Sequence, residues 1–377
     1  WNSTAKWPDF DCLIPPLWIN NRFTVKVGVI DELIQILNYC HELQLSPMVM
    51  THGQRLLAEP RYLERLVVEG SLDKVSIHID TTQKGRLGMH ARDTETDIHW
   101  IRDSFANLIR ETRKSTRKRL AASTTYTVTA GNIDYISDVL EWCTDNADAF
   151  RMISFQPTAD VGRNREDEQV GRRELVWRRI CEGVGVRLNH ETFKFGHPSC
   201  NSVALMFVIK FHNGATVEKH IMEVNRSNHS EDQAFFESLF HGGFAGFTPD
   251  GEALEIAFAR LLGRIRLNPL MLFKIPSYSL GRLWHERTWI KGFLSAVASS
   301  RTWSINPFVV IVHNFMSAHE LDTPEGQERL QACAFRVPVD GHMVSMCELN
   351  GTDMRRDMNR SDRDRLIPIV EPIHGAG

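Results

Sequence analysis

A chain of 377 residues with 42% hydrophobic and 24% charged residues has the composition of an ordinary globular protein, long enough for one large domain or two modest ones. Its net charge of −3 excludes the broad positive field that sequence-independent nucleic-acid binding requires. The longest apolar stretches, residues 268–278 and 306–316, fall well short of the roughly 20 residues of a membrane span, so no transmembrane segment is predicted.

The first 28 residues begin with Trp1 rather than Met and show no regular hydrophobic period. We interpret residues 1–28 as an irregular or misread leader. From residue 29 to 165, amphipathic helices alternate with short apolar strands, which is typical of βα units and a parallel sheet. Right-handed crossovers between such strands build a parallel sheet or part of a (βα) barrel. Strands are predicted at 47–50, 75–79, 121–129 and 152–156, and helices at 30–40, 62–68, 98–109 and 133–146.

The segment 160–174 is polar and is interpreted as a domain boundary, so residues 166–377 are predicted to form an α+β C-terminal domain. Strands are expected at 203–211 and 308–313, and helices near 233–239 and 252–262. Asp340 and Gly341 predict the turn of a β-hairpin. The aromatic residues Trp284, Trp289, Phe293 and Trp303 are interpreted as core, although the walls of a lipid pocket would need similar side chains.

Polar residues stand at or just after the ends of the four N-terminal strands, and Asn132 is placed to cap the last predicted helix. The carboxyl ends of parallel strands share one rim in a βα barrel, so these positions predict a site for a polar cofactor. Polar residues also end strands that bind nothing, which leaves the site open on this pattern alone. The candidate cofactor-binding residues are Thr51, Gly53, His78, Asp80, Thr127, Asn132, Gln156 and Arg163.

The amino-acid sequences of these segments resemble consecutive blocks of a radical S-adenosylmethionine (radical SAM) barrel: MTHGQRLL, EGSLDKVSIHIDTTQKGR, TTYTVTAGNIDYISDVLEW and SFQPTADVGR. Thr51 and Gly53 match the T-N-G loop of that superfamily, with His52 in place of its Asn. Within the superfamily, the chain is most similar to the group of the archaeal tetraether-lipid synthase and of proteins labelled pterin dimethyltransferases. That resemblance implies methylation or C–C bond formation at an unactivated carbon of a lipid or pterin-like substrate.

The C-terminal half extends the resemblance. GHPSCNSVALMFV is similar to an H-P-x-C segment of that group, and residues 313–350 are similar to its closing block. The resemblance implies that Cys200, Cys333 and Cys347 are ligands of an auxiliary Fe–S cluster. Cys40, Cys143 and Cys181 follow helical apolar faces and are interpreted as core residues. Seven scattered cysteines favour a reducing compartment, and the protein is expected in the cytoplasm, either free or peripheral to the membrane.

A radical SAM enzyme uses S-adenosyl-L-methionine and a [4Fe–4S] cluster held by C-x-x-x-C-x-x-C, which receives an electron from a donor such as ferredoxin or flavodoxin. The 377 residues contain no such triad. Two interpretations therefore stay open: a radical SAM enzyme, present as a truncated or an inactive copy, or a degenerate SAM-binding barrel with a regulatory or scaffold role. A third, a conventional barrel lyase or isomerase, predicts a phosphate-binding Gly-rich loop, for which residues 241–244 are a poor match.

Overall fold

The computed structural model describes residues 18–20, 29–43, 45–83, 86, 88–161, 173–227, 229–240, 265–266, 268–300 and 302–358. Their helices and strands follow in this order: β1 (Trp18–Asn20), α1 (Val29–Glu42), β2 (Met48–Thr51), α2 (Gln54–Ala58), α3 (Pro60–Val68), β3 (Lys74–His78), α4 (His99–Thr116), β4 (Ala121–Val128), η1 (Ile133–Tyr135), α5 (Ile136–Asp145), β5 (Phe150–Pro157), α6 (Arg173–Val184), β6 (Asn201–Asn213), β7 (Thr216–Glu223), α7 (Ser230–Phe240), α9 (Met271–His285), α10 (Arg287–Ser299), β8 (Thr302–His313), η3 (Ala318–Glu320), α11 (Pro324–Gln331), β9 (Arg336–Val339), β10 (His342–Ser345) and α12 (Met346–Gly351).

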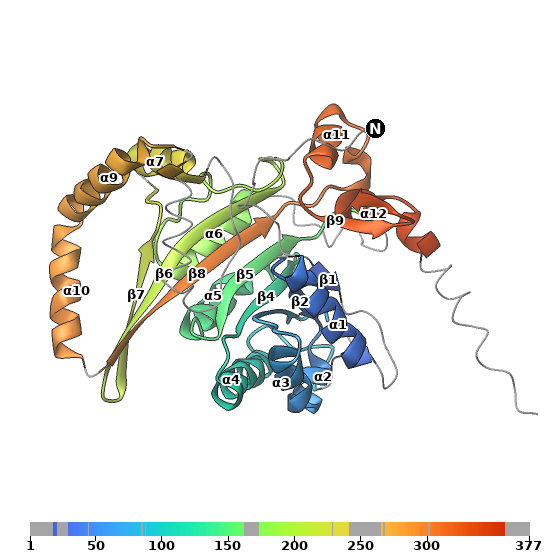
Figure 1. Ribbon diagram of the computed structural model, residues 1–377, viewed down its shortest axis with the longest axis horizontal. Helices are drawn as coiled ribbons and strands as arrows, with labels where there is room; N and C mark the ends of the chain where they lie inside the picture. Colours follow the sequence, from blue (N-terminus) through green and yellow to red (C-terminus); the bar gives the residue numbers. More distant parts are fainter. Residues whose placement is uncertain are drawn as a thin grey trace, which may run out of the picture.

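One mixed, mostly parallel sheet organises these elements, with strand order β1-β2-β3-β4-β5-β8-β6-β7 (Figure 1). Strands β1 to β5 and β8 run parallel, whereas β6 pairs antiparallel with both β7 and β8. The predicted α/β class and parallel βα units are thereby confirmed. Within the described residues β1 and β7 are the two edges of this sheet, and no closed barrel is formed.

The N-terminal helices lie where the hydrophobic period predicts them, because each buries a stripe of apolar residues against the sheet. In α1 the buried positions are Leu33, Leu37 and Cys40, and in α4 they include Ile101, Phe105 and Ile109. Cys143 on α5 is fully buried, as predicted. These stripes join the outward-facing strand residues in one large hydrophobic core.

Successive side chains of a strand point to opposite faces, so the sheet has a second face, which carries both apolar and polar residues. Met48, Met152, Val309 and Ile311 form a smaller apolar cluster on this face, with Phe193 packed among them. The register continues the same face with polar residues: Ser76 pairs with Ser123, His78 with Thr125, Thr125 with Ser154, and Thr127 with Gln156.

The sheet continues across residue 165, where the sequence suggested a domain boundary. Strand β8 lies beside β5 and pairs Met152 with Val309 and Phe155 with Val312. Residues more than 150 positions apart therefore share one sheet, and β6 and β7 extend it further. The division into domains 29–165 and 166–377 stays a prediction.

Local details differ from expectation at one helix and agree at one turn. Asn132 precedes η1 without a side-chain capping bond, so the predicted capping role of this residue is wrong. Strands β9 and β10 form the predicted hairpin, and both Asp340 and Gly341 have positive φ, as a type I′ turn requires. The helix expected at 252–262 and the loop at 241–244 lie outside the described residues.

Candidate functional site

The loop after β3 places His78 and Asp80 at the carboxyl edge of the sheet. His78 Nε2 lies 2.7 Å from Asp80 Oδ2 and 3.0 Å from Thr127 Oγ1, and Gln83 Nε2 lies 3.1 Å from His78 Nδ1. A carboxylate only accepts hydrogen bonds, so Nε2 of His78 carries a proton that it donates to Asp80. The His78 side chain is 31% exposed.

Asp80 itself is fully buried and its oxygens are engaged. Oδ2 accepts from the backbone N–H of Thr127 at 2.7 Å, and Oδ1 accepts from that of Thr82 at 2.9 Å. Burial alone raises the pKa of Asp80, but the hydrogen bonds from His78, Thr127 and Thr82 outweigh it and hold the pKa below its ordinary value. Asp80 therefore orients His78 and the loop, and its own oxygens are not exposed to a ligand.

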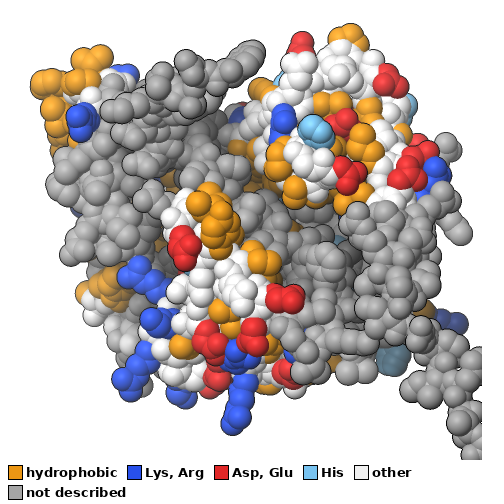
Figure 2. Space-filling model, turned by 45° about the vertical axis from the view of Figure 1, so that its right-hand side comes forward, with side chains coloured by type: hydrophobic (Ala, Val, Ile, Leu, Met, Phe, Trp, Pro, Cys, Tyr) orange, Lys and Arg blue, Asp and Glu red, His pale blue; other side chains and the backbone are white. Residues whose placement is uncertain are grey.

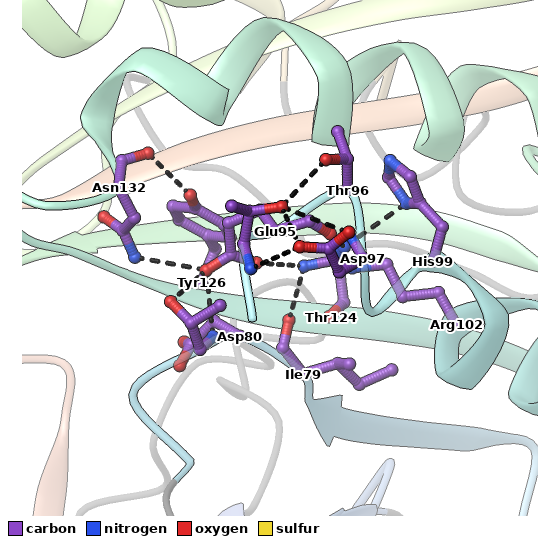
Figure 3. Close-up of polar contacts among 12 residues, drawn as sticks. Ile79, Asp80, Glu95, Thr96, Asp97, His99, Arg102, Thr124, Tyr126 and Asn132 are labelled. Carbon is purple, nitrogen blue, oxygen red and sulfur yellow. Dashed lines mark hydrogen bonds and ion pairs between the residues drawn. The ribbon is translucent and has the colours of Figure 1, made fainter. Parts of the chain in front are cut away.

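A buried ion pair between Glu95 and Arg102 fastens the same loop to α4, with both side chains 0% exposed (Figure 3). Glu95 Oε1 accepts from the backbone N–H of Thr81 at 2.9 Å and from Asn132 Nδ2 at 3.3 Å, and Arg102 donates to the carbonyls of Glu95 and Ile79. Sequence analysis missed this pair. Nothing in the local pattern distinguishes these two charges from the neighbouring solvated ones.

Asn132 belongs to this internal network. Its Oδ1 accepts from the N–H of Thr129 at 2.8 Å, and its Nδ2 donates to the carbonyl of Thr127 at 2.9 Å as well as to Glu95. Only 2% of the residue is exposed. The Asn132 amide thus holds the end of β4 against the loop after β3. A ligand could bind this amide only by displacing these hydrogen bonds.

Thr51 and Gly53 form a tight turn after β2 that faces away from His78. Thr51 pairs with Ile77, whose side chain belongs to the large helix-side core, and its Oγ1 accepts from the N–H of Gly53 at 3.0 Å. Gly53 has φ +80°, and a Cβ on it would lie 2.6 Å from the ring of Phe105. This glycine is required by backbone conformation and by packing.

Arg86 is a second charged residue of the site that sequence analysis did not single out. It is 3% exposed, donates to the carbonyl of His78, and lies over the ring of Phe105. Among the described residues its Nε has no hydrogen-bond partner. Burial lowers the pKa of Arg86 to about 10, partly offset by Asp80, so the guanidinium stays charged at neutral pH.

The eight candidate cofactor residues therefore divide by accessibility. Gly53, Asp80 and Asn132 are buried and serve the local structure, and Arg163 lies outside the described residues. Gln156 Nε2 makes one long contact, 3.4 Å, to Ser154 Oγ. Half-buried His78, Thr127 and Gln156 lie on the polar face of the sheet, whereas half-buried Thr51 lies on the other face.

His52, at the same edge of the sheet, is expected to make the stability of the fold depend on pH. Burial, then the charges of Arg86 and His78, lower its pKa to about 4. The unfolded chain gains this proton near pH 6.5, so stability is complete above about 6.5 and falls as the pH drops from about 6.5 to about 4. The full shift would correspond to about 3 kcal/mol, which partial solvent exposure reduces to about 1–2 kcal/mol.

Replacing His52 with Asn is expected to remove that part of the pH dependence. The measurement is the free energy of unfolding by denaturant at about pH 7 and about pH 5 for both proteins. His90→Asn, at an exposed position, is the matched control and should leave the dependence as in the parent. An unchanged pH dependence in His52→Asn would contradict the assignment.

A second candidate site lies where three segments of the C-terminal half meet. Cys200 ends the turn before β6, Cys333 follows α11, and Cys347 is the second residue of α12, yet all three line one cavity of about 20 Å³. Burial, with a smaller contribution from the neighbouring Cys333 and Cys200, raises the pKa of Cys347 to about 11. Burial also raises the pKa of Cys333, with Cys200 adding to the effect. The three residues named by the resemblance are thus brought together.

The fit of this cavity to a metal depends on its donors. Arg329 Nε lies 3.5 Å from Cys200 Sγ. His197 and His313 line the same cavity. However, no group of three or more His, Cys, Asp or Glu among the described residues is arranged to hold a metal ion. The donor types suit an Fe–S cluster, whereas their present arrangement is not that of a ligand set.

Three other cysteine and histidine predictions can be compared with the structure. Cys40 and Cys143 are buried, while Cys181 is half-buried against the large core. His313 is buried, and its Nδ1 has no hydrogen-bond partner among the described residues. Cys12 lies outside the described residues.

Comparison with known proteins adds little to this geometry. No family model and no curated protein matches the chain. The X-ray crystal structure of the Paramecium bursaria Chlorella virus arginine decarboxylase aligns with 54% of this chain and 52% of its own, at 12% sequence identity and a TM-score of 0.27. The present chain thus spans about half the length of that decarboxylase, and a likeness at this level carries no argument about fold or function.

Proposed function

We propose that the chain is a radical SAM-type protein that acts on an unactivated carbon of a lipid or pterin-like substrate, by methylation or C–C bond formation. The observation that supports this most is the convergence of Cys200, Cys333 and Cys347 on one cavity. The resemblance assigned these residues to an Fe–S site from separate stretches of sequence.

In this proposal the carboxyl edge of the sheet binds SAM. His78, Thr127 and Gln156 present polar groups from neighbouring strands on one face. Asp80 keeps His78 in the Nε2–H form, and the buried guanidinium of Arg86 supplies positive charge next to both. These residues would bind and orient a zwitterionic, polar cofactor and would not themselves move electrons. In folds built on parallel strands, ligands usually bind at the carboxyl ends of the strands.

Cys200, Cys333 and Cys347 are the residues proposed to hold an auxiliary cluster, a one-electron redox centre when bound, and their side chains would have to rearrange to become a ligand set. The electron donor would be a ferredoxin- or flavodoxin-type protein. Arg329 would act on Cys200 through its Nε contact and would not be a ligand. The expected location is the cytoplasm, with contact to the membrane surface where the substrate is a lipid.

The alternative is a degenerate SAM-binding barrel with a regulatory or scaffold role. The lack of C-x-x-x-C-x-x-C in the 377 residues favours it, since SAM cleavage needs that cluster. The two proposals share the SAM site and differ in whether iron binds. Measurements of iron and SAM on one preparation therefore separate them.

Anaerobic reconstitution with iron and sulfide is expected to load one cluster per chain, with broad visible absorbance. Replacing Cys200, Cys333 and Cys347 together by Ser should remove this iron, because Ser is a poor ligand for a soft Fe–S centre. Cys181→Ser is the matched control, since Cys181 is half-buried and lies on α6, outside the cavity, and it should retain the parent iron content.

SAM binding is measured on the same proteins by equilibrium dialysis. His78→Ala should weaken it by about tenfold, the value of one lost hydrogen bond to a charged ligand. Iron that persists in the triple variant would sink the cluster assignment. SAM binding without any iron in the parent would favour the scaffold alternative, and neither ligand binding would reject both proposals.

A further inference from the structure

The helices α9 and α10 form an arm at the β7 end of the sheet, which we call the helical arm (residues 271–299; Figure 1). The sequence predicted that Trp284 and Trp289 of the arm and Trp303 of β8 are core residues. That prediction is wrong: Trp284 is 68% exposed, and Trp289 and Trp303 are exposed too. Phe293 anchors the arm by packing on Phe211 of β6, with ring centroids 5.7 Å apart. The rest of α10 has no buried residue.

The exposed apolar residues of α9 share one face. At 100° per residue, the positions of these side chains fall within an arc of about 120°. Each is between 54% and 76% exposed, far more than a core-facing stripe would be. Leu294 adds an exposed position on α10. The residues of the α9 stripe are Leu272, Phe273, Leu280, Leu283 and Trp284.

Charge on the arm has the opposite sign to that of the chain. Residues 268–300 contain four basic residues and one acidic residue, a net charge of +3 in a chain of net charge −3. The one acidic residue, Glu286, is engaged by Arg282 at 2.9 Å. Lys274 and Lys291 make no ion pair with any described residue, and Arg287 lies over the ring of Trp284 at 4.8 Å. The arm is therefore both apolar and cationic.

A groove of about 560 Å³ between α7 and α9 continues this surface. Its walls combine aromatic rings with positive charge, which suits an anionic head group beside an apolar chain. Its lining includes Phe235, Phe273, Tyr278, Arg226, Lys274 and Arg282, together with one acidic residue, Glu231. Arg282 is paired with Asp232 and Glu286, so Lys274 is the basic lining residue of α9 without an ion pair to a described residue.

We propose that the helical arm docks on an anionic lipid bilayer surface. Helices that lie in a membrane interface combine Trp, Phe and Leu on one face with Lys and Arg around it, as this arm does. A second copy of the chain fits less well, because two arms of net charge +3 would repel each other. No described helix is long and apolar enough to cross a bilayer, so the contact would be interfacial. This inference needs neither SAM nor a cluster and is independent of the proposed function.

The test is sedimentation of the full chain with phosphatidylcholine vesicles, with and without phosphatidylglycerol. We expect binding to anionic vesicles and little to neutral ones. The double variant Leu280→Ser/Trp284→Ser removes apolar contact, and Lys274→Glu/Lys291→Glu reverses charge. Each basic residue near an anionic surface raises the partition coefficient of a protein onto that surface about fivefold. The charge variant, which changes two such residues, should therefore bind anionic vesicles at least about 25-fold more weakly than the parent.

Ile36→Ser/Leu43→Ser is the matched control, since both side chains are exposed apolar positions on or just after α1, far from the arm in the sheet order. It should bind vesicles like the parent. Circular dichroism checks that every variant is folded, and a blue shift of tryptophan emission on vesicle addition, lost in Trp284→Phe, places the arm in the interface. Equal binding of the parent and both arm variants, equal binding to neutral vesicles, or a concentration-dependent dimer abolished by the arm variants would each overturn the proposal.

Discussion

Replacing Glu95 with Gln is expected to lower the free energy of unfolding by about 3–5 kcal/mol, because it leaves the buried Arg102 guanidinium without a counter-charge. The effect is large since both side chains are 0% exposed and water cannot solvate the orphaned charge. The same change weakens the bond from the N–H of Thr81, which ties the loop after β3 to this pair. Loss of the pair would therefore loosen His78 and Asp80 as well.

Denaturant unfolding of the parent and Glu95→Gln gives the comparison directly. Asp31→Asn is the matched control: its partner Arg65 lies at 2.7 Å, but both are well exposed. Acidic and basic side chains mix over the surface formed by α1 and α3, at the lower centre of Figure 2. An exposed pair there should contribute less than about 1 kcal/mol. Equal losses in the two variants would show that burial does not govern the Glu95–Arg102 pair.

Gly53→Ala is the second change expected to have a large effect, about 2–4 kcal/mol of unfolding free energy. A left-handed backbone costs an alanine about 1–2 kcal/mol, and forcing a methyl group against a packed ring adds a comparable amount. The added Cβ would lie 2.6 Å from Cζ of Phe105, which is fully buried and cannot move aside freely. The turn after β2 should shift, and SAM binding should weaken with it if the proposed site is correct.

Gly185→Ala separates the cost of the left-handed backbone from that of the clash with Phe105. Gly185 also has positive φ, +72°, but a Cβ there meets nothing within 4 Å. Its replacement should cost only the backbone part, about 1–2 kcal/mol. Combining Gly53→Ala with Phe105→Leu should recover some of the loss relative to the sum of the single changes, since the two sites are in contact. Additive losses would argue against the steric explanation.

Local pattern predicted the secondary structure of the N-terminal half well. The period of Leu33, Leu37 and Cys40 predicts α1, and the β-branched residues of 75–79 predict β3, because burial of one stripe or one face is decided within a few residues. The Asp340–Gly341 hairpin follows for the same reason, since only residues that tolerate positive φ occupy such a turn. Asn132 shows the limit, because its amide is used by tertiary partners in place of the helix N-terminus.

The site was predictable only in part. Polar residues at the strand ends predicted a site at this edge, and the register puts His78, Thr127 and Gln156 on one face. Which of them stay accessible could not be read from the strands: Asp80 and Asn132 are buried by partners that lie in other segments. Arg86 and Glu95 were missed because their roles arise from burial, which no local pattern of charges reveals.

The sequence by itself determined the α/β class, the parallel βα order and the turn chemistry, all of which depend on neighbours close in the chain. Only the tertiary structure decided that β8 lies beside β5, that Cys200, Cys333 and Cys347 share a cavity, and that Trp284 is exposed. An apolar residue has the same local pattern whether it packs inward or stays in water. The difference is made by long-range contacts, whose free energies appear only once distant segments have been brought together.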